Sequence, residues 1–251
     1  MWATKKIFDL SNDSLMALIR NEIPAVQIAD FARPAEIKSL KQTLLDQSRR
    51  THSIKQVTRL GISQYAQGIC QSKANYFHLV PGVMKELAEA FRSSFDPLSR
   101  FITSLSSSGF DAGVMQEPGF GSYAPCAGKL RNGFSPIHVD FAAQDSADWE
   151  VGAAPVQLAW NLYLDMPAIG GELMLWDRQW QPEIDRYLVR DNYYYEDAVV
   201  ADLEPLRIRP IDGQLLVLNS RNFHAVDQVS DRLTIGGFIS YFPEKSLRLW
   251  I

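Results

Sequence analysis

Two histidines and one aspartate are the residues best suited to chemistry in this sequence. His138 and Asp140 stand two positions apart, and His224 follows in the C-terminal third. Side chains two positions apart on an extended segment point to the same side, so one stretch could bring an imidazole and a carboxylate to one metal ion. Two histidines and one carboxylate suit Fe(II) and oxygen chemistry. The His-x-Asp pair alone is a weak signal, because a hydrogen-bonded strand histidine beside a turn aspartate is common.

An arginine shortly after the second histidine strengthens this interpretation. Arg232 opens an apolar strand pattern, where a guanidinium buried without an anion would be costly. A carboxylate held in a bidentate fork would remove that cost. Thr234 shares the face of Arg232 and could add a hydroxyl to the same carboxylate. A surface pair with Asp231 is the alternative for Arg232 alone, but the combination with the histidines favours an anion site.

Five other residues could line such a site. Lys129 and Arg131 precede the first histidine and could bind an acidic substrate, although a solvated pair is the commoner arrangement. Phe141 follows the aspartate and could form part of the site wall. Tyr163 and Asn161 share one face of a predicted strand. An ordinary strand aromatic is nearly as common an explanation of Tyr163.

The elements that must position these side chains are short strands in the second half of the chain. Turns rich in Gly, Pro and Asp-Gly separate five candidate strands, at residues 135–141, 156–164, 172–176, 214–218 and 233–241. Short strands at this spacing predict a sandwich or barrel rather than alternating strands and helices. The long polar segment 181–205, with Tyr193 to Tyr195 at its centre, interrupts them and predicts a lid or binding loop.

Helical patterns dominate the chain before residue 110. A helix is predicted from Pro34, which suits a first helical turn, and a second helical pattern runs from Val83 to Phe101. Residues 23–28 predict a short strand. We therefore expect one domain over residues 1–251, mainly β with a helical annex. Its helix-rich part covers residues 1–110 and its β core residues 111–245.

The composition excludes several classes of protein. Hydrophobic residues make up 46% of the chain and charged residues 22%, as in ordinary globular domains. The net charge is −4 and no long basic cluster exists, which argues against a nucleic-acid partner. No stretch predicts a membrane span or a signal peptide. Cys70 and Cys126 form no metal-binding pair, and free thiols favour a cytoplasmic location. The sequence gives no indication of oligomeric state.

The motifs together resemble a known enzyme family. His138-Val139-Asp140, His224 and Arg232 are similar to the H-x-D…H…R pattern of the Fe(II)/2-oxoglutarate-dependent oxygenases. The resemblance covers roughly residues 120–242. It extends to Tyr163-Leu164 and to the turn Gly170-Gly171-Glu172-Leu173, as in the prolyl-hydroxylase-like branch. The local sequence also resembles that of the freestanding halogenases of indole-alkaloid pathways. Those halogenases carry a small residue in place of Asp140, which frees a coordination position for chloride.

The resemblance implies a double-stranded β-helix, that is, a cupin-like jelly-roll, with a metal site at its open end. It implies that Fe(II) is held by His138, Asp140 and His224. It implies that 2-oxoglutarate binds at Arg232, with help from Thr234 and Tyr163. Substrate residues are expected at Phe141 and Asn161.

The activity that the resemblance implies is oxidation of an unactivated C–H bond with dioxygen, releasing succinate and carbon dioxide. Because a carboxylate stands at Asp140, hydroxylation is expected rather than halogenation. The expected substrate is a small molecule, such as an amino acid derivative or a specialised metabolite. Two other classes stay open from the residues themselves: a cupin-like metal-dependent hydrolase or isomerase, and a non-catalytic jelly-roll binding protein.

Overall fold

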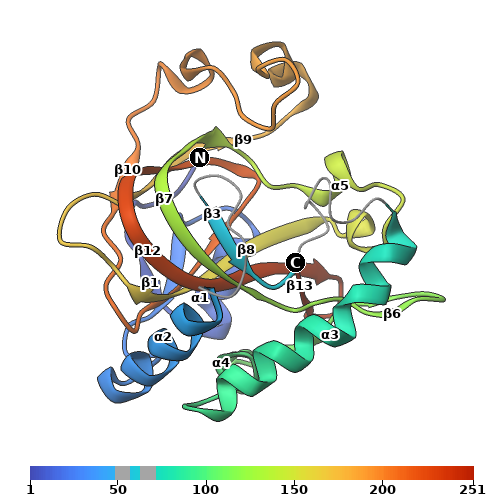
Figure 1. Ribbon diagram of the computed structural model, residues 1–251. Helices are drawn as coiled ribbons and strands as arrows, with labels where there is room; N and C mark the ends of the chain where they lie inside the picture. Colours follow the sequence, from blue (N-terminus) through green and yellow to red (C-terminus); the bar gives the residue numbers. More distant parts are fainter. Residues whose placement is uncertain (49–56, 63–71) are drawn as a thin grey trace.

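A strongly curled β-sheet forms the centre of the molecule. The computed structural model describes residues 1–48, 57–62 and 72–251, and Cys70 therefore lies outside the described residues (Figure 1). One path of hydrogen-bonded strands runs β1-β2-β11-β8-β12-β13-β4, and β7, β3, β9 and β10 branch from it through β12. The predicted mainly β, jelly-roll fold is confirmed.

The N-terminal elements are mostly helices. Their bounds are β1 Phe8–Asp9, α1 Asn12–Ile19, β2 Ala25–Ile28, α2 Pro34–Ser48, β3 Val57–Leu60, α3 Lys73–Arg92 and α4 Pro97–Ser107. The predicted helix from Pro34 and the predicted strand at residues 23–28 are confirmed as α2 and β2.

The prediction of one helical pattern from Val83 to Phe101 is wrong, because the chain forms two helices there. Helix α3 ends at Arg92, and α4 begins at Pro97. Asp96 caps α4, since its Oδ1 accepts a hydrogen bond from the Ser99 backbone at 3.0 Å. Proline fixes its own φ and disfavours helical geometry in the residue before it, so the helix restarts at this point.

The remaining elements build the curled sheet and its connections. Their bounds are β4 Asp111–Val114, β5 Gln116–Glu117, β6 Gly121–Ser122, β7 Ala127–His138, α5 Ala142–Asp145, β8 Val156–Asp165, β9 Leu173–Gln179, β10 Leu206–Ile208, β11 Leu215–Asn219, β12 Asn222–Phe242 and β13 Ser246–Trp250. Three short 3-10 helices lie between strands: η1 Glu150–Ala153, η2 Pro182–Tyr187 and η3 Asp197–Val200. The strands predicted at 156–164, 172–176 and 214–218 are confirmed as β8, β9 and β11.

The other two predicted strands differ in their bounds. Strand β7 begins well before residue 135 and ends at His138, so Asp140 lies just beyond it. The strand predicted at 233–241 is the second half of β12. The pairing of β12 with β7 shifts register three times between His224 and Arg232, and Asp231 has a φ of 56°. These bulges bend β12. Because the residues at the bulges are polar, the sequence pattern does not predict the first half of this strand.

Because of this bend, β12 pairs with strands on both sides of the curled sheet. Residues 222–226 pair with β9, whereas residues 233–241 pair with β8. The glycine turn before β9 packs on the bend. Gly170 has a φ of 78°, and a Cβ atom there would lie 2.0 Å from the Gln228 carbonyl oxygen. Only glycine fits this close approach.

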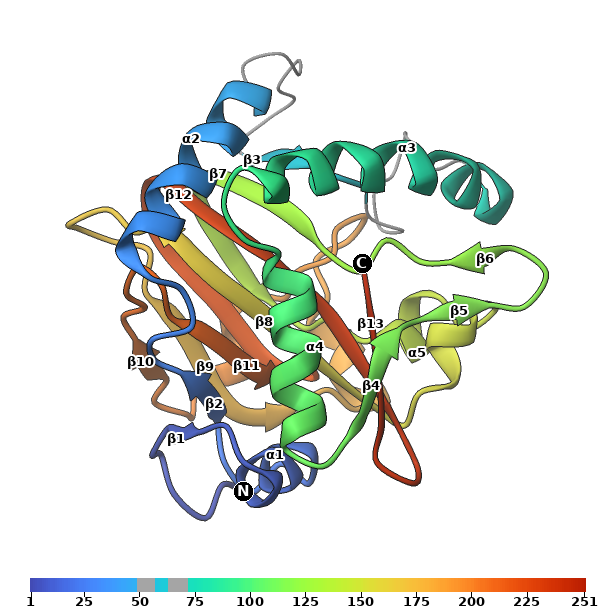
Figure 2. The same cartoon turned by 90° about the horizontal axis from the view of Figure 1, so that it is seen from below.

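Three apolar clusters pack against the curled sheet. Helices α2 and α4 cover its outer face (Figure 2). Leu40 of α2 and Phe101 of α4 belong to one apolar cluster with Trp160 of β8. A second cluster inside the curl includes Tyr163, Phe238 and Trp250. The third lies under residues 195–203 and has seven fully or nearly buried members: Val139, Trp176, Tyr195, Val199, Val200, Phe223 and Ala225.

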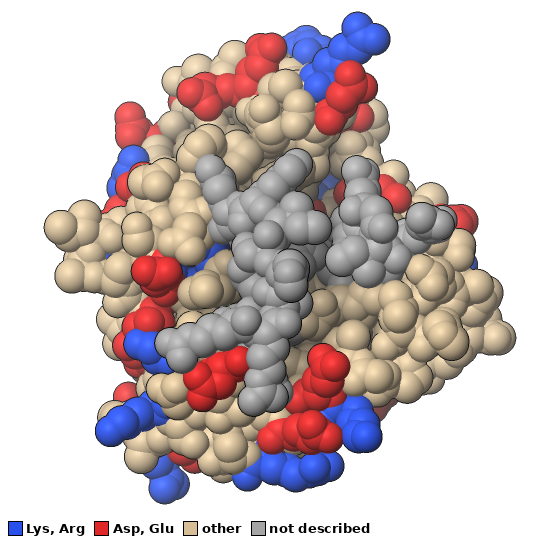
Figure 3. Space-filling view, in the orientation of Figure 1, with Lys and Arg blue, Asp and Glu red and all other residues tan. Residues whose placement is uncertain are grey.

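The surface carries both signs of charge. Basic and acidic side chains alternate around the edge of the face seen in Figure 3. Cys126 is buried and free. Among the described residues, no helix is long and apolar enough to cross a membrane.

Candidate metal and anion site

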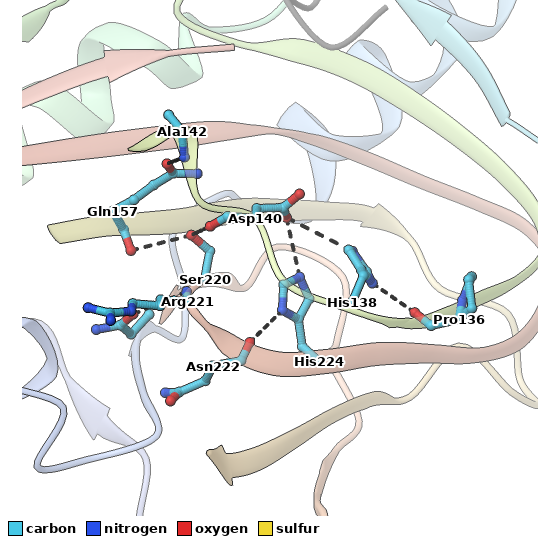
Figure 4. A network of polar contacts seen from close by, with 10 residues as sticks. Pro136, His138, Asp140, Ala142, Gln157, Ser220, Arg221, Asn222 and His224 are labelled. Atoms are coloured by element: carbon cyan, nitrogen blue, oxygen red, sulfur yellow. Dashed lines mark hydrogen bonds and ion pairs between the residues drawn. The ribbon is translucent and has the colours of Figure 1, made fainter. Parts of the chain in front are cut away.

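The sheet brings the two histidines and the aspartate together (Figure 4). His138 ends β7 and His224 lies directly opposite it near the start of β12, with ring centroids 4.2 Å apart. The Asp140 Oδ2 atom lies 3.3 Å from His224 Nε2 and 3.9 Å from His138 Nε2. One potential ligand atom from each residue lies within 4.8 Å of the other two. This is the three-residue cluster that the sequence predicts.

Backbone carbonyl groups fix the orientation of both imidazole rings. His138 Nδ1 lies 2.8 Å from the Pro136 oxygen, and His224 Nδ1 lies 2.9 Å from the Asn222 oxygen (Figure 4). A carbonyl oxygen only accepts, so each Nδ1–H donates and each Nε2 keeps its lone pair for a metal ion. Ring orientation of this kind is typical of histidine ligands.

Asp140 is held in place although it lies outside a strand. Its backbone N–H donates to the Ser220 carbonyl oxygen at 2.9 Å, and the Ser220 hydroxyl donates to the Asp140 carbonyl oxygen at 2.9 Å. The serine hydroxyl also reaches the Gln157 oxygen of β8 at 3.3 Å. Sequence reasoning missed Ser220, because nothing in its neighbourhood distinguishes it from an ordinary turn serine.

The protonation states of the cluster suit metal binding at neutral pH. Burial and the nearby His224 lower the pKa of His138 to about 4, against the opposing effect of Asp140. Burial alone would raise the pKa of Asp140, but the close contact with His224 and the charges around it hold that pKa well below its ordinary value. A neutral imidazole and an ionised carboxylate are the forms that bind metal ions.

A cavity of about 90 Å³ lies beside this cluster, and the residues of the predicted anion site line it. Arg232, Thr234, Tyr163 and Asn161 all line it together with the two histidines and Asp140. Thr234 lies directly opposite Tyr163 in the pairing of β12 with β8. The cavity has room for several water molecules or for part of a ligand.

The polar atoms of this cavity fit an anionic ligand. The Arg232 side chain is buried, and its Nε and Nη1 atoms have no hydrogen-bond partner among the described residues. The Tyr163 hydroxyl is in the same situation, with the Arg232 guanidinium 5.2 Å from its ring centroid. Buried donors without acceptors are costly, and a carboxylate would satisfy all three atoms. The alternative, an ion pair of Arg232 with Asp231, is not among the ion pairs of the described residues.

The structure also places Phe141, Lys129 and Arg131. Phe141 follows Asp140 and is not among the residues that line this cavity; its ring packs 6.0 Å from the Trp180 ring and 5.0 Å from the Arg221 guanidinium. Its role in the wall of a substrate site stays a prediction. Lys129 and Arg131, interpreted as a solvated pair, do line it and are half-buried. Their position depends on the pairing of β7 with β12, which the sequence does not reveal.

The segment predicted as a lid reaches the metal cluster. It stands out at the top of Figure 1 and contains η2 and η3. Tyr194 forms an antiparallel bridge with His138, and the Tyr195 N–H donates to the Ile137 oxygen at 2.8 Å. The Tyr193 ring packs edge-on at 5.6 Å from the His138 ring. The segment thus extends β7 at the residue that carries the first imidazole.

Sequence comparisons identify relatives along almost the whole chain. A family model described as carrier-protein-independent halogenase WelO5 matches residues 5–247. The leucinostatins biosynthesis cluster protein S of Purpureocillium lilacinum is 32% identical over 197 residues, which cover 73% of this chain and 79% of that protein. An L-gamma-glutamyl-L-propargylglycine hydroxylase of Streptantibioticus cattleyicolor is 33% identical over 97 residues, covering 38% and 35% of the two chains.

Solved structures share the fold. An N-substituted L-amino acid dioxygenase from Burkholderia ambifaria superposes with a TM-score of 0.64 at 17% identity, over 96% of this chain and 91% of that chain. Its complex with alpha-KG, that is 2-oxoglutarate, gives 0.62 at 18% identity, over 95% and 90%. Likeness at this identity establishes the fold, and the family model establishes the family. A cupin-like hydrolase or isomerase and a non-catalytic binding protein are therefore set aside.

The chain belongs to the carrier-protein-independent halogenase WelO5 family of Fe(II)/2-oxoglutarate-dependent oxygenases, and it is a non-haem iron dioxygenase that uses Fe(II), 2-oxoglutarate and dioxygen.

Proposed function

We propose that this enzyme hydroxylates an unactivated C–H bond of a small amino acid derivative. The observation that carries the proposal is the carboxylate of Asp140, 3.3 Å from His224 Nε2. The halogenases that the sequence resembles have a small residue at this position, which leaves room for chloride. A carboxylate fills that position here. In the proposed reaction one oxygen atom of dioxygen enters the substrate as a hydroxyl group and the other enters succinate, while 2-oxoglutarate loses carbon dioxide.

In this proposal His138, Asp140 and His224 hold Fe(II) through two Nε2 atoms and one carboxylate. The bound iron and 2-oxoglutarate together supply the oxidising power by activating dioxygen. Everything else that the chain contributes is binding and orientation. The carbonyl groups behind the two rings keep the imidazoles oriented toward the metal. The buried side chains that line the cavity, such as Tyr163 and Leu173, limit the access of water.

Arg232 and two neighbours bind the far carboxylate of 2-oxoglutarate in this proposal. The guanidinium forms a bidentate fork that matches a carboxylate. Burial raises the pKa of the Tyr163 hydroxyl, although the Arg232 charge acts in the opposite sense, so the phenol stays neutral and can donate. Thr234 presents a third donor from the same face of β12 as Arg232.

The relatives support a small amino acid derivative as substrate. The relative from S. cattleyicolor is named as a hydroxylase of L-gamma-glutamyl-L-propargylglycine, an amino acid that carries a gamma-glutamyl group. The B. ambifaria enzyme that shares the fold is named for N-substituted L-amino acids. Both names describe small acids.

Product analysis with isotope-labelled dioxygen tests the proposal. The purified enzyme is supplied with Fe(II), 2-oxoglutarate and a set of N-acylated apolar amino acids in buffer that contains chloride. We expect a product that gains one labelled oxygen atom, together with labelled succinate. Halogenation is the second candidate, which membership of a halogenase family favours. A chlorinated product that disappears without chloride would contradict hydroxylation.

A further inference from the structure

Asp140 differs from the two histidines of the cluster in the way that its backbone is held. His138 ends β7 and His224 lies within β12, so the sheet places both rings. Asp140 lies on the short connection between the end of β7 and the start of helix α5 at Ala142. A carboxylate on such a connection keeps a fixed position when neighbouring groups hold the backbone on both sides of it.

The backbone that follows Asp140 is held by Gln157 of β8. The first N–H groups of a helix have no partner within the helix, and Phe141, which precedes α5, supplies no side-chain cap. The Gln157 Oε1 atom accepts the Ala142 N–H at 2.7 Å in the buried interior (Figure 4). A side chain from the central sheet therefore caps the helix that begins two residues after the carboxylate.

Gln157 also supports Asp140 through Ser220. The Gln157 carbonyl oxygen accepts the Ser220 N–H at 3.3 Å and lies 3.3 Å from the Ser220 hydroxyl. Ser220 in turn accepts the Asp140 N–H and donates its hydroxyl to the Asp140 carbonyl oxygen, both at 2.9 Å. One residue of β8 thus lies behind the support at Asp140 itself and the support at Ala142.

The other half of the Gln157 amide makes a purely structural role a poor explanation. Only the oxygen can accept the Ala142 N–H, so the amide orientation is fixed. The Nε2 atom is buried without a hydrogen-bond partner among the described residues, and the side chain is 1% exposed. A buried donor without an acceptor is costly, so removing it offsets the loss of the bond to Ala142. Residues that are unfavourable for stability are expected at functional sites.

We propose that Gln157 is a positioning residue for the iron site. Its Oε1 atom fixes the segment that carries Asp140, and so fixes the carboxylate relative to the two imidazoles. The proposal rests on the assignment of Asp140 as an iron ligand in the proposed function, and it adds a residue that acts through that ligand. Removing such an outer partner typically lowers metal affinity tenfold to a hundredfold.

The position of Gln157 along β8 separates this role from co-substrate binding. Gln157 lies near the start of β8, whereas Tyr163 of the anion site lies near its end, about 20 Å along the strand. Loss of the Gln157 side chain should therefore change the affinity for Fe(II) and leave the affinity for 2-oxoglutarate at saturating Fe(II) within about twofold of wild type.

Gln157→Met tests the proposal, because it removes both amide atoms and keeps the length of the side chain. Competition with a chelator, without oxygen, measures the Fe(II) dissociation constant, and thermal unfolding measures the Tm of the metal-free protein. We expect the constant to rise about tenfold or more and the Tm to stay within about 4 °C of wild type. Gln157→Glu keeps an acceptor and should keep most of the affinity. Gln157→Asn is too short to reach Ala142 and gives the same test if the methionine variant does not fold.

Gln214 is the matched control, because it is a buried glutamine whose two amide atoms are both paired. Its Oε1 atom accepts the Ile211 N–H at 3.2 Å, and its Nε2 atom donates to the Gln27 Oε1 atom at 2.8 Å. It is not among the residues that line the cavity of the metal cluster. Gln214→Met should lower the Tm and leave the Fe(II) affinity unchanged, which is the opposite pattern to Gln157→Met.

Three results would overturn the proposal. They are an unchanged Fe(II) affinity in folded Gln157→Met or Gln157→Asn, equal losses of affinity in Gln157→Met and Gln157→Glu, and a fall in Tm as large as that of Gln214→Met. The last result would make Gln157 a structural residue. Wild-type enzyme that fails to bind Fe(II) would instead contradict the proposed function, so the two failures are distinguishable.

Discussion

His138 and His224 lie directly opposite each other where β7 pairs with β12, and each ring is anchored to a carbonyl oxygen two residues earlier in its own strand. The sheet itself therefore sets the separation and orientation of both imidazoles. The metal cluster does not depend on a flexible loop for two of its three members. Only Asp140 lies outside a strand, and Ser220 holds its backbone.

We expect His224→Ala to lose Fe(II) binding while keeping the fold. Among the side chains that the structure describes, the removed ring contacts only those of the cluster, so the loss should fall on the metal and not on the sheet. Anaerobic metal analysis after gel filtration measures the bound iron, and far-ultraviolet circular dichroism checks the fold. His78→Ala removes an exposed histidine of α3 and is the control. Wild-type iron content in His224→Ala would remove this residue from the ligand set.

Arg232→Gln should raise the 2-oxoglutarate concentration needed for half-saturation by about tenfold to a hundredfold, the range for a lost charged hydrogen bond. Iron binding should stay unchanged, because Arg232 lies outside the histidine and aspartate cluster. The measurement is the dissociation constant of 2-oxoglutarate on Fe(II)-loaded enzyme without oxygen. Lys38→Gln, an exposed change on α2, is the control. An unchanged constant would place the co-substrate elsewhere.

Periodicity predicts the parts of the fold in which one pattern continues without interruption. Strands β8 and β11 and helix α2 are of this kind, and the residues that they carry, Tyr163 and Asn161 included, are where the sequence predicts them. The single helix predicted from Val83 to Phe101 fails because its apolar rhythm continues through Pro97, where a new helix begins. An apolar rhythm gives no warning of a cap such as Asp96.

In the site too, the sequence predicts what the spacing of nearby residues determines and does not predict what the pairing of distant strands determines. The His-x-Asp spacing and the position of Arg232 are local, so the sequence reveals them. The inward position of Lys129 and Arg131 is not local. It depends on which residues of β12 they face, and the bulges between His224 and Arg232 set that register. Counting residues along a bulged strand does not predict this register.

Tyr193→Ala should weaken the coupling of 2-oxoglutarate consumption to substrate oxidation. The ring lies 5.6 Å from the His138 ring and is largely exposed, so we expect it to limit solvent access to the first imidazole. We expect more succinate per product and a higher substrate KM, with unchanged binding of Fe(II) and 2-oxoglutarate. Tyr193→Phe keeps the ring and should resemble wild type. Unchanged coupling in Tyr193→Ala would show that the segment 181–205 shields nothing through this residue.

Glu36→Gln should destabilise the protein at neutral pH but not at very low pH. Hydrogen bonds from Arg100 and from the Arg33 backbone lower the pKa of Glu36 from 4.5 to about 2. A lowered folded-state pKa stabilises the native state above the unfolded-state pKa, and this stabilisation is lost as pH falls toward 2. Urea unfolding at several pH values should show a difference from wild type that is full above pH 4.5 and shrinks below it. A difference independent of pH would contradict this.

The most direct test of the central claim is an anaerobic titration of the Fe(II)-loaded enzyme with 2-oxoglutarate, followed by visible absorption. Chelation of a keto acid by non-haem iron gives a weak charge-transfer band. We predict a saturable band in the wild type, its loss in His224→Ala, and a shift of its midpoint to higher 2-oxoglutarate in Arg232→Gln. Iron that binds without any such band would contradict the assignment of this cavity as the co-substrate site.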